Sequence, residues 1–234
     1  MKKSVFCLIA ICSFWSCAEL QQVVNQLPQG TTIGNDEIAS GLRQALNFGI
    51  EKQVTKLTQT DGFFGNEMVK ILLPEELQKV DKGLRDIGLG NLADEGLKIL
   101  NRAAEDAVKE ATPIFVNAVK EITFADAKTI LLGSDNAATQ YLTNKTETAL
   151  YNKFNPVIKN SFDKVGADQI WSNLINRYNA IPFTTDVNPD LTDYVTKEAL
   201  KGVYTMIAVE EKKIRNKVSS RTTDLLRKVF ALQD

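Results

Sequence analysis

The sequence contains no histidine, and its three cysteines, Cys7, Cys12 and Cys17, all lie within the first 17 residues. Ser–His and Cys–His nucleophile systems need an imidazole base and are therefore excluded. The common zinc sites and the di-iron sites of helical bundles use histidine or cysteine ligands and are excluded on the same ground. A domain that follows residue 17 has no thiol for a disulfide or a thiolate site. We predict neither a metal nor a cofactor.

An all-oxygen calcium or magnesium site is the one metal chemistry that the composition leaves open. The best acidic loop, residues 186–190, has neither the glycine nor the terminal glutamate of an EF-hand loop. We interpret its acidic residues as helix caps rather than as metal ligands.

The chain also lacks a strong excess of either charge. Without the first 16 residues, 26 Lys and Arg and 29 Asp and Glu leave a net charge near −3. This balance gives no general attraction to nucleic-acid phosphates, so we predict no nucleic-acid partner. A hydrophobic content of 44% with 24% charged residues is ordinary for a globular protein, and 234 residues can bury a sizeable core.

The apolar run over residues 5–12 is too short to span a bilayer, which needs about 20 apolar residues. It follows Lys2 and Lys3 and precedes Ser16-Cys17, an order typical of a secretory signal segment. A small residue directly before a cysteine resembles a lipobox. We predict a lipoprotein signal peptide over 1–16, with Cys17 lipidated and anchoring the chain to a membrane. Cleavage after Ala18 is the alternative, and it would release a soluble protein without Cys17.

Residues 17–35 are polar, with Gly and Pro, and predict a tether between the anchor and a domain. Ala18 is not the aspartate associated with retention in the inner membrane, and no acidic run associated with surface export follows Cys17. We therefore predict a lipid-anchored protein on the periplasmic face of the outer membrane.

From residue 36 onward, apolar residues recur at intervals of three and four, which is typical of amphipathic helices. The pattern predicts one all-α domain over 36–234, a multi-helix bundle with kinked long helices and at most one short extended segment near 68–73. Pro113 falls inside a helical pattern and predicts a kink or a break near Thr112, and Pro156 predicts an interruption of the helical pattern over 134–164. The predicted helices cover residues 36–57, 74–87, 92–122, 123–132, 134–164, 168–180, 191–216 and 219–232.

Several short segments together form a recognisable pattern: residues 41–46, 61–63, 101–105, 131–141, 181–183, 193–196, 210–211 and 221–226. Together they resemble domain of unknown function family 4197, a family of exported bacterial proteins. The resemblance runs from about residue 36 to 230. It implies an exported protein that starts with a signal peptide or a lipoprotein signal, but it implies no activity.

Asn101, Arg102 and Glu105 form the best polar cluster within a predicted helix, and their spacing places them on neighbouring turns of it. A carboxylate among small apolar residues can serve as a general acid, so Glu105 is the single catalytic candidate. Asn101 and Arg102 are candidate ligand-binding residues. The interpretation that we favour is an ion-pair network that joins helices, with Arg215 or Arg221 as a partner.

Three other features allow a structural and a functional interpretation. Glu211 and Arg215 are spaced for a favourable pair, so we interpret residues 210–211 as part of a solvated helix face. Arg221 either belongs to the capping of the last helix or binds an anion together with the free N–H groups of that helix. The apolar loops 62–65 and 181–183 either pack onto the bundle, line a groove for an apolar ligand, or touch a membrane.

Two classes of function fit these observations. The first is a non-catalytic envelope lipoprotein whose helical domain binds a partner protein or an apolar or amphipathic ligand. The second is a carboxylate-dependent hydrolase that acts on cell-wall or glycan material, with Glu105 as its acid. We favour the first, because the usual nucleophiles, bases and metal ligands are missing.

Overall fold

A computed structural model describes residues 34–75, 90–180 and 185–233, together with single positions between these ranges at 78, 82, 85, 86, 88, 182 and 183. Residues Asn35–Asp234 form one compact unit, distinct from Met1–Gly34. The predicted signal peptide and nearly all of the predicted tether lie outside the described residues. None of the described helices has the length and apolarity that a membrane crossing requires.

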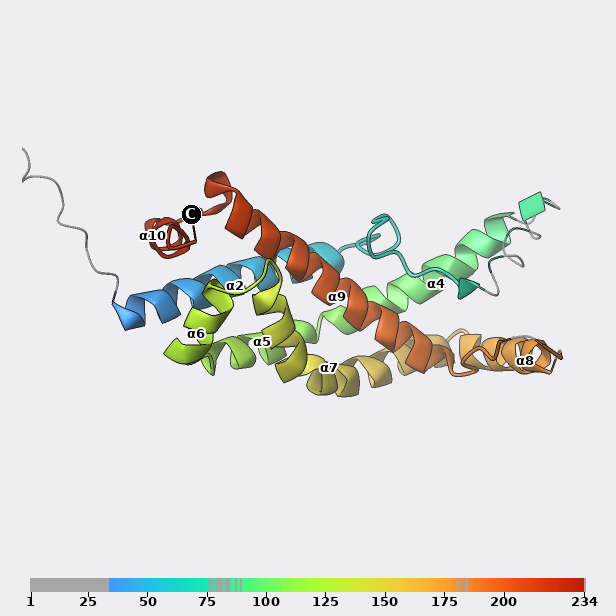
Figure 1. The fold of residues 1–234 in the computed structure, drawn as a ribbon. Coiled ribbons are helices and arrows are strands. Elements are labelled where there is room, and N and C mark those ends of the chain that lie inside the picture. The colour runs from blue at the N-terminus through green and yellow to red at the C-terminus, as the bar shows by residue number, and fades with distance from the viewer. Residues whose placement is uncertain are drawn as a thin grey trace, which may run out of the picture. The chain divides into compact units, whose positions relative to one another are not determined.

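All regular structure in the described residues is helical, which confirms the prediction of an all-α bundle. Residues 70–74, near the predicted extended segment, are neither helix nor strand. The eight described α-helices and one 3-10 turn (Figure 1) are α2 (Asn35–Leu57), α4 (Gly90–Val108), α5 (Ala111–Lys120), α6 (Phe124–Leu131), α7 (Ala137–Asp163), α8 (Ala167–Asn179), α9 (Leu191–Asn216), η1 (Val218–Ser220) and α10 (Asp224–Phe230).

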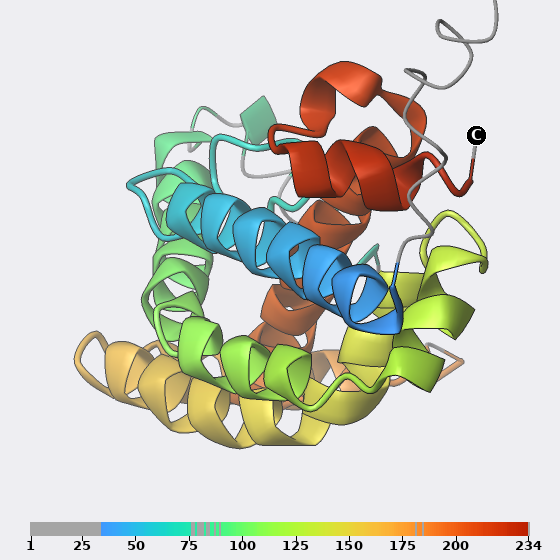
Figure 2. The same cartoon turned by 90° about the vertical axis from the view of Figure 1, so that its left-hand side faces the viewer.

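Helix α9 is the central element of the bundle. It packs most extensively against α7 and also against α2 and α4 (Figures 1 and 2). Its inward face is apolar along the middle of the helix, where Val195, Ala199 and Val203 are fully buried. With 26 residues and a rise of 1.5 Å per residue, α9 is about 39 Å long. It runs from its contact with α8 to its contact with α6, so it connects two separate ends of the bundle.

The helical pattern over residues 92–122 is divided into two helices, α4 and α5, as predicted. The break falls at Lys109 and Glu110 rather than at Thr112, and Pro113 lies in the first turn of α5. A proline costs little there, because the first N–H groups of a helix have no acceptor within the helix. The proline therefore follows the break and starts the second helix.

The predicted interruption at Pro156 is wrong, because α7 continues through it as a single helix. Phe154 and Ile158, on either side of the proline, are fully buried in the core. Packing of both side chains outweighs the loss of one hydrogen bond.

The predicted final helix over 219–232 is also wrong in extent. Its first part is the 3-10 turn η1, and α10 begins only at Asp224. The Thr223 side chain caps α10 by accepting a hydrogen bond from the Leu226 N–H at 3.2 Å. The capping box predicted at Thr123 and Asp126 is confirmed at the start of α6. The helix predicted over 74–87 lies mostly outside the described residues, although positions 75, 78, 82, 85 and 86 are helical.

Candidate functional site

The predicted cluster on α4 faces the connection that leaves α2. Glu105, 4% exposed, accepts a hydrogen bond from the Phe63 N–H at 3.1 Å through Oε1. Arg102 donates from Nη1 to Glu105 Oε2 at 2.6 Å and from Nη2 to Asp61 Oδ1 at 2.9 Å. The hydrogen bond and the charge of Glu105 raise the pKa of Arg102 above its usual value. The three side chains tie the start of the connection to α4.

Asn101 secures the other end of the same connection. Its side chain is fully buried, accepts from the Ile71 N–H at 2.8 Å and donates to the Ile71 carbonyl at 2.9 Å. A further bond to the Leu97 carbonyl, at 2.7 Å, fixes the amide on α4 itself. We call Asn101, Arg102 and Glu105 the α4 clasp. The clasp gives residues 61–71, which contain no helix or strand, fixed points at both ends.

The sequence pattern did not identify Asp61 as the partner of Arg102, and it offered Arg215 or Arg221 as the further member of the ion-pair network. The available signal was an acid in a turn directly after an amphipathic helix and before Gly62. Asp61 has a φ of 63°, in the left-handed region that few residues other than glycine adopt. Its ion pair with Arg102 helps to hold that conformation.

The two aromatic side chains of the 62–65 loop are less exposed than their position in a loop suggests. Phe63 is fully buried and packs against Gly202 of α9, while Phe64 is half-buried. Lys70 Nζ lies 4.4 Å from the centre of the Phe64 ring, a cation–π distance. This loop therefore packs onto the bundle.

Substituting Gly202 tests the packing of this loop. In Gly202→Ala the new Cβ would lie 2.6 Å from Phe63 Cε1, so we expect the free energy of unfolding to fall by about 1–3 kcal/mol. Gly96→Ala on α4 is the matched control, because nothing lies within 4 Å of its new Cβ. The control should be neutral or stabilising by up to about 1 kcal/mol. Equal urea midpoints for the two variants would contradict the packing.

The surroundings of Glu105 limit its chemistry. Both carboxylate oxygens already accept hydrogen bonds, one from the Phe63 N–H and one from Arg102. A polar hollow of about 280 Å³ lies beside the loop, and its lining includes Lys56, Asp61 and Glu67 but not Glu105. Both oxygens of Glu105 are therefore engaged in hydrogen bonds within the fold, and its side chain does not line the adjacent hollow.

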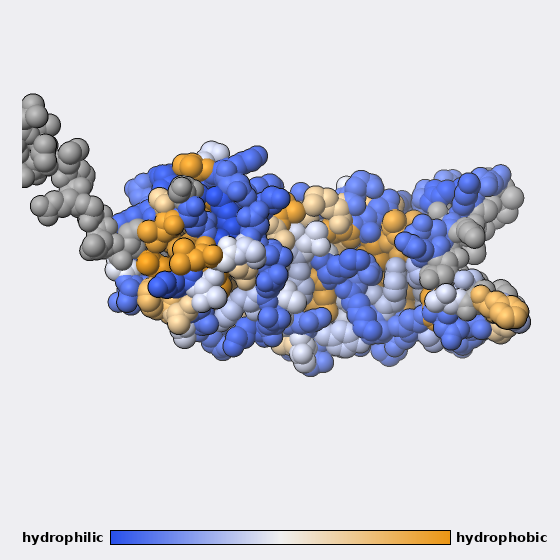
Figure 3. Space-filling model, in the orientation of Figure 1, coloured by the Kyte–Doolittle hydropathy of each residue, from blue (hydrophilic) through white to orange (hydrophobic). Residues whose placement is uncertain are grey.

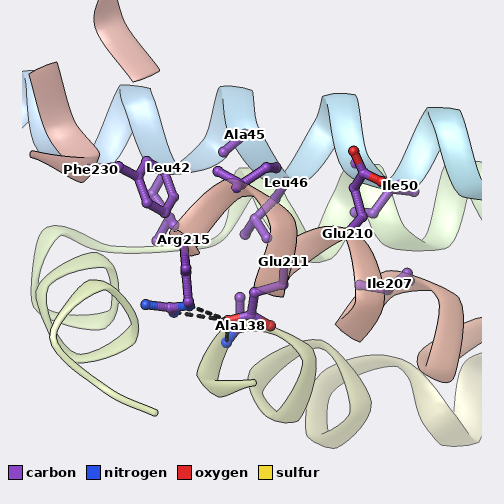
Figure 4. Close-up of a pocket in the computed structure, with 12 residues that line it drawn as sticks. Leu42, Ala45, Leu46, Ile50, Ala138, Ile207, Glu210, Glu211, Arg215 and Phe230 are labelled. Carbon is purple, nitrogen blue, oxygen red and sulfur yellow. Dashed lines mark hydrogen bonds and ion pairs between the residues drawn. The ribbon is translucent and has the colours of Figure 1, made fainter. Parts of the chain in front are cut away.

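Glu211 and Arg215 form a second polar cluster, and the prediction of a solvated helix face is wrong. Glu211 is 7% exposed and Arg215 is 6% exposed. Arg215 donates two hydrogen bonds to Glu211 Oε1, from Nη2 at 2.8 Å and from Nε at 3.0 Å (Figure 4). The same guanidinium donates to the carbonyls of Ile130 and Leu131 at 2.8 and 3.0 Å. Arg215 thus satisfies the last carbonyls of α6, where a helix favours positive charge.

Glu211 satisfies the start of the next helix, α7. Its carboxylate accepts from the Ala138 N–H at 2.9 Å, and from the N–H and the hydroxyl of Thr139 at 2.8 Å each. A helix N-terminus favours negative charge, so the buried pair joins the C-terminus of α6 to the N-terminus of α7. We call Glu211 and Arg215 the α9 pair.

Glu210 is also buried, 2% exposed, and points to a different helix. It accepts from Lys52 Nζ at 2.5 Å and from Gln53 Nε2 at 2.8 Å, both on α2. The two adjacent glutamates therefore connect α9 to different neighbours.

A cavity lies beside the α9 pair, between α2, α9 and α10, and most of its lining is apolar, including Leu42, Leu46 and Phe230 (Figure 4). Its volume of about 20 Å³ is that of a single water site. An acyl chain or another apolar ligand does not fit in it.

Arg221 is buried, 2% exposed, at the end of α9. It donates from Nε to the Ile214 carbonyl at 3.1 Å and from Nη2 to the Arg215 carbonyl at 2.8 Å. The α4 clasp binds a different part of the chain, so the fold does not bring Arg221 into the network proposed for Glu105.

The 186–190 loop supplies the start of α9. Asp190 accepts from the Asp193 N–H at 2.9 Å, which is an N-cap contact. Within the described ranges, no group of three or more histidine, cysteine, aspartate or glutamate side chains is placed to hold a metal ion.

The described part of the 181–183 loop, by contrast, presents an aromatic side chain to solvent. Phe183 is fully exposed and has a φ of 70°. A bulky residue in the left-handed region is a conformational outlier, and such outliers cluster at functional sites. Val187, a few residues later in the same connection, is buried.

The fold and these contacts define an all-α bundle. Its polar clusters, the α4 clasp and the α9 pair, connect separate parts of the bundle to one another. The chain belongs to DUF4197, a family described as a protein of unknown function, whose model matches residues 32–231. Comparisons with curated proteins and with solved structures found no match.

Proposed function

We propose that this chain is a non-catalytic lipoprotein of the cell envelope whose helical domain binds a partner protein. The signal-like segment before Cys17 supports anchoring through a lipid on that residue, on the periplasmic face of the outer membrane. Because α2 begins at Asn35, residues 18–34 are the part of the predicted tether that separates Cys17 from the domain.

The hydrogen bonds that engage both carboxylate oxygens of Glu105 are the observation that supports a non-catalytic role. A glycosidase needs two carboxyl groups that flank an accessible bond. Here Glu105 and Asp61 bind the same guanidinium, and a backbone N–H occupies the remaining oxygen of Glu105. The arrangement supports a structural role for the α4 clasp.

Two observations favour a partner protein over an enclosed apolar ligand. The apolar cavity has room for about one water molecule. Phe183, in contrast, offers a whole aromatic ring to a partner, and aromatic side chains are enriched among residues that dominate binding energy. We place the partner contact at the connection between α8 and α9.

Crosslinking in the bacterial host tests the partner contact. A photoreactive amino acid at the exposed Asp186 should give an adduct with one discrete protein, and Phe183→Ser should lower its yield about tenfold. The same photoreactive group at Lys201, exposed on α9, is the positional control. Adducts that are unchanged by Phe183→Ser, or that form equally from position 201, would contradict the assignment.

Replacement of Cys17 tests the anchor. Cys17→Ala should abolish incorporation of labelled fatty acid and move the protein from the membrane fraction to the soluble envelope fraction. Ser16→Ala, which keeps a small residue before the cysteine, is the control and should stay lipidated. Membrane attachment that survives Cys17→Ala would defeat the claim.

A further inference from the structure

One end of the bundle carries exposed apolar side chains from two segments that are distant in the sequence. Leu132, just after α6, is 61% exposed, and Leu232, just after α10, is 47% exposed. Gln233 donates a hydrogen bond to the Leu131 carbonyl, so the two segments are neighbours. Figure 3 shows hydrophobic surface gathered over α6 and α10. Ala231, next to Leu232, is exposed as well. We call Leu132, Ala231 and Leu232 the end patch.

The end patch lies where the chain enters the domain. Lys228, one turn before Leu232, pairs with Glu37 in the first turn of α2 at 3.0 Å. Figure 2 looks onto this end and shows the start of α2, α6 and the C-terminus together. The 17 residues of the tether, 18–34, therefore connect Cys17 to this end of the bundle.

The length of the tether limits how far the domain can lie from the anchor. Its 17 residues span at most about 60 Å, the length of a fully extended chain. A lipid on Cys17 would thus keep the end patch close to the bilayer and at high effective concentration near it. Under these conditions, burial of the two exposed leucines in the bilayer adds to the hold of the anchor, although it would not recruit a free protein to a membrane.

We propose that the end patch rests on the surface of the membrane that carries the anchor. This inference relies on the lipid anchor of the proposed function. The charges beside the patch are of both signs: Lys228 pairs with Glu37, and Lys128 and Asp135 lie four residues before and three residues after Leu132 in the sequence. The contact is therefore apolar and does not require anionic lipids. Because α9 is about 39 Å long, this orientation directs α8 and Phe183 away from the bilayer.

Chemical anchoring tests the inference without relying on lipidation in the cell. Cys17 is the only cysteine in residues 17–234, so the chain that starts at Cys17 can be coupled to maleimide-bearing lipids in vesicles. Leu232→Trp then reports contact with acyl chains through quenching by brominated lipids. Trp171, the only other tryptophan in these residues, is buried and gives a constant background. Ile170→Trp is the matched control, since Ile170 is 70% exposed on α8.

We expect strong quenching of the tryptophan introduced by Leu232→Trp, none of the one introduced by Ile170→Trp, and the same result in neutral and anionic vesicles. Adding Leu132→Asp to Leu232→Trp should lower the docked fraction about tenfold. Equal quenching at the two positions, or none at either, would overturn the inference. So would sedimentation showing that a second copy of the chain covers the patch. A chain that docks when coupled chemically but is not lipidated in cells would leave the inference standing and refute the anchor.

Discussion

Replacing Arg215 with methionine is expected to lower the free energy of unfolding by about 3–5 kcal/mol, because it leaves a buried charge without its partner. Glu211 would keep its bonds to the start of α7, but its negative charge would lose the guanidinium that lies 2.8 Å away. The Ile130 and Leu131 carbonyls would lose their donors as well. Equilibrium urea denaturation, followed by circular dichroism, measures the change.

Two further variants make this prediction specific. Arg227→Met removes an exposed ion pair with Asp224 and a hydrogen bond to the Arg221 carbonyl, and it should cost at most about 2 kcal/mol. The double variant Glu211→Gln with Arg215→Met should be more stable than Arg215→Met alone, because no unpaired charge stays buried. A loss for Arg215→Met no larger than that for Arg227→Met would show that the α9 pair does not join α6 to α7.

Replacing Asn101 with leucine should cost about 3 kcal/mol, because the N–H and carbonyl of Ile71 would both lose a buried partner. Leucine has the same branched shape and the same number of side-chain heavy atoms as asparagine, and its helix propensity is high, so a loss of helix formation does not explain such a change. Protection of the Ile71 N–H from hydrogen exchange should fall in parallel.

The control for this variant is Asn216→Leu. Asn216 is exposed and donates a single bond to the Lys212 carbonyl within its own helix. We expect a change within about 0.5 kcal/mol. Similar losses at positions 101 and 216, with unchanged exchange at Ile71, would contradict the role of the α4 clasp.

Helical periodicity was sufficient to predict the long helices, because each one buries a continuous apolar face. Helix α9 was predicted over 191–216 and is found at Leu191–Asn216. The end of a helix depends on local chemistry that the sequence also shows, such as the capping box at Thr123. Pro156 was misread because the sequence does not reveal how firmly Phe154 and Ile158 are packed on either side of it.

Burial of charge could not be predicted in the same way. The spacing of Glu211 and Arg215 is equally compatible with an exposed pair and with a buried one. Their burial depends on the ends of α6 and α7, which come from residues more than 70 positions earlier in the chain. Likewise, the partner of Arg102 is Asp61, 41 residues away, in a turn whose position periodicity does not determine.

Most of the segments that carry the family resemblance contact one another in the fold. Residues 61–63 meet 101–105 at the α4 clasp, and residues 131–141 meet Glu211 and Arg215 at the α9 pair. Residues 41–46 meet 221–226 through the Thr223 hydroxyl, which donates to Gln44 Oε1 at 2.9 Å. In the sequence these motifs resemble functional sites. In the fold, their contacts hold the bundle together.

The central claim is that a lipid on Cys17 anchors the helical domain. Intact-mass measurement of the protein purified from the membranes of its bacterial host is the most direct test. We predict a chain that begins at Cys17 and carries the mass of a diacylglyceryl group. A chain that begins at Glu19 without added mass would contradict the claim, because it would have lost Cys17 on cleavage after Ala18.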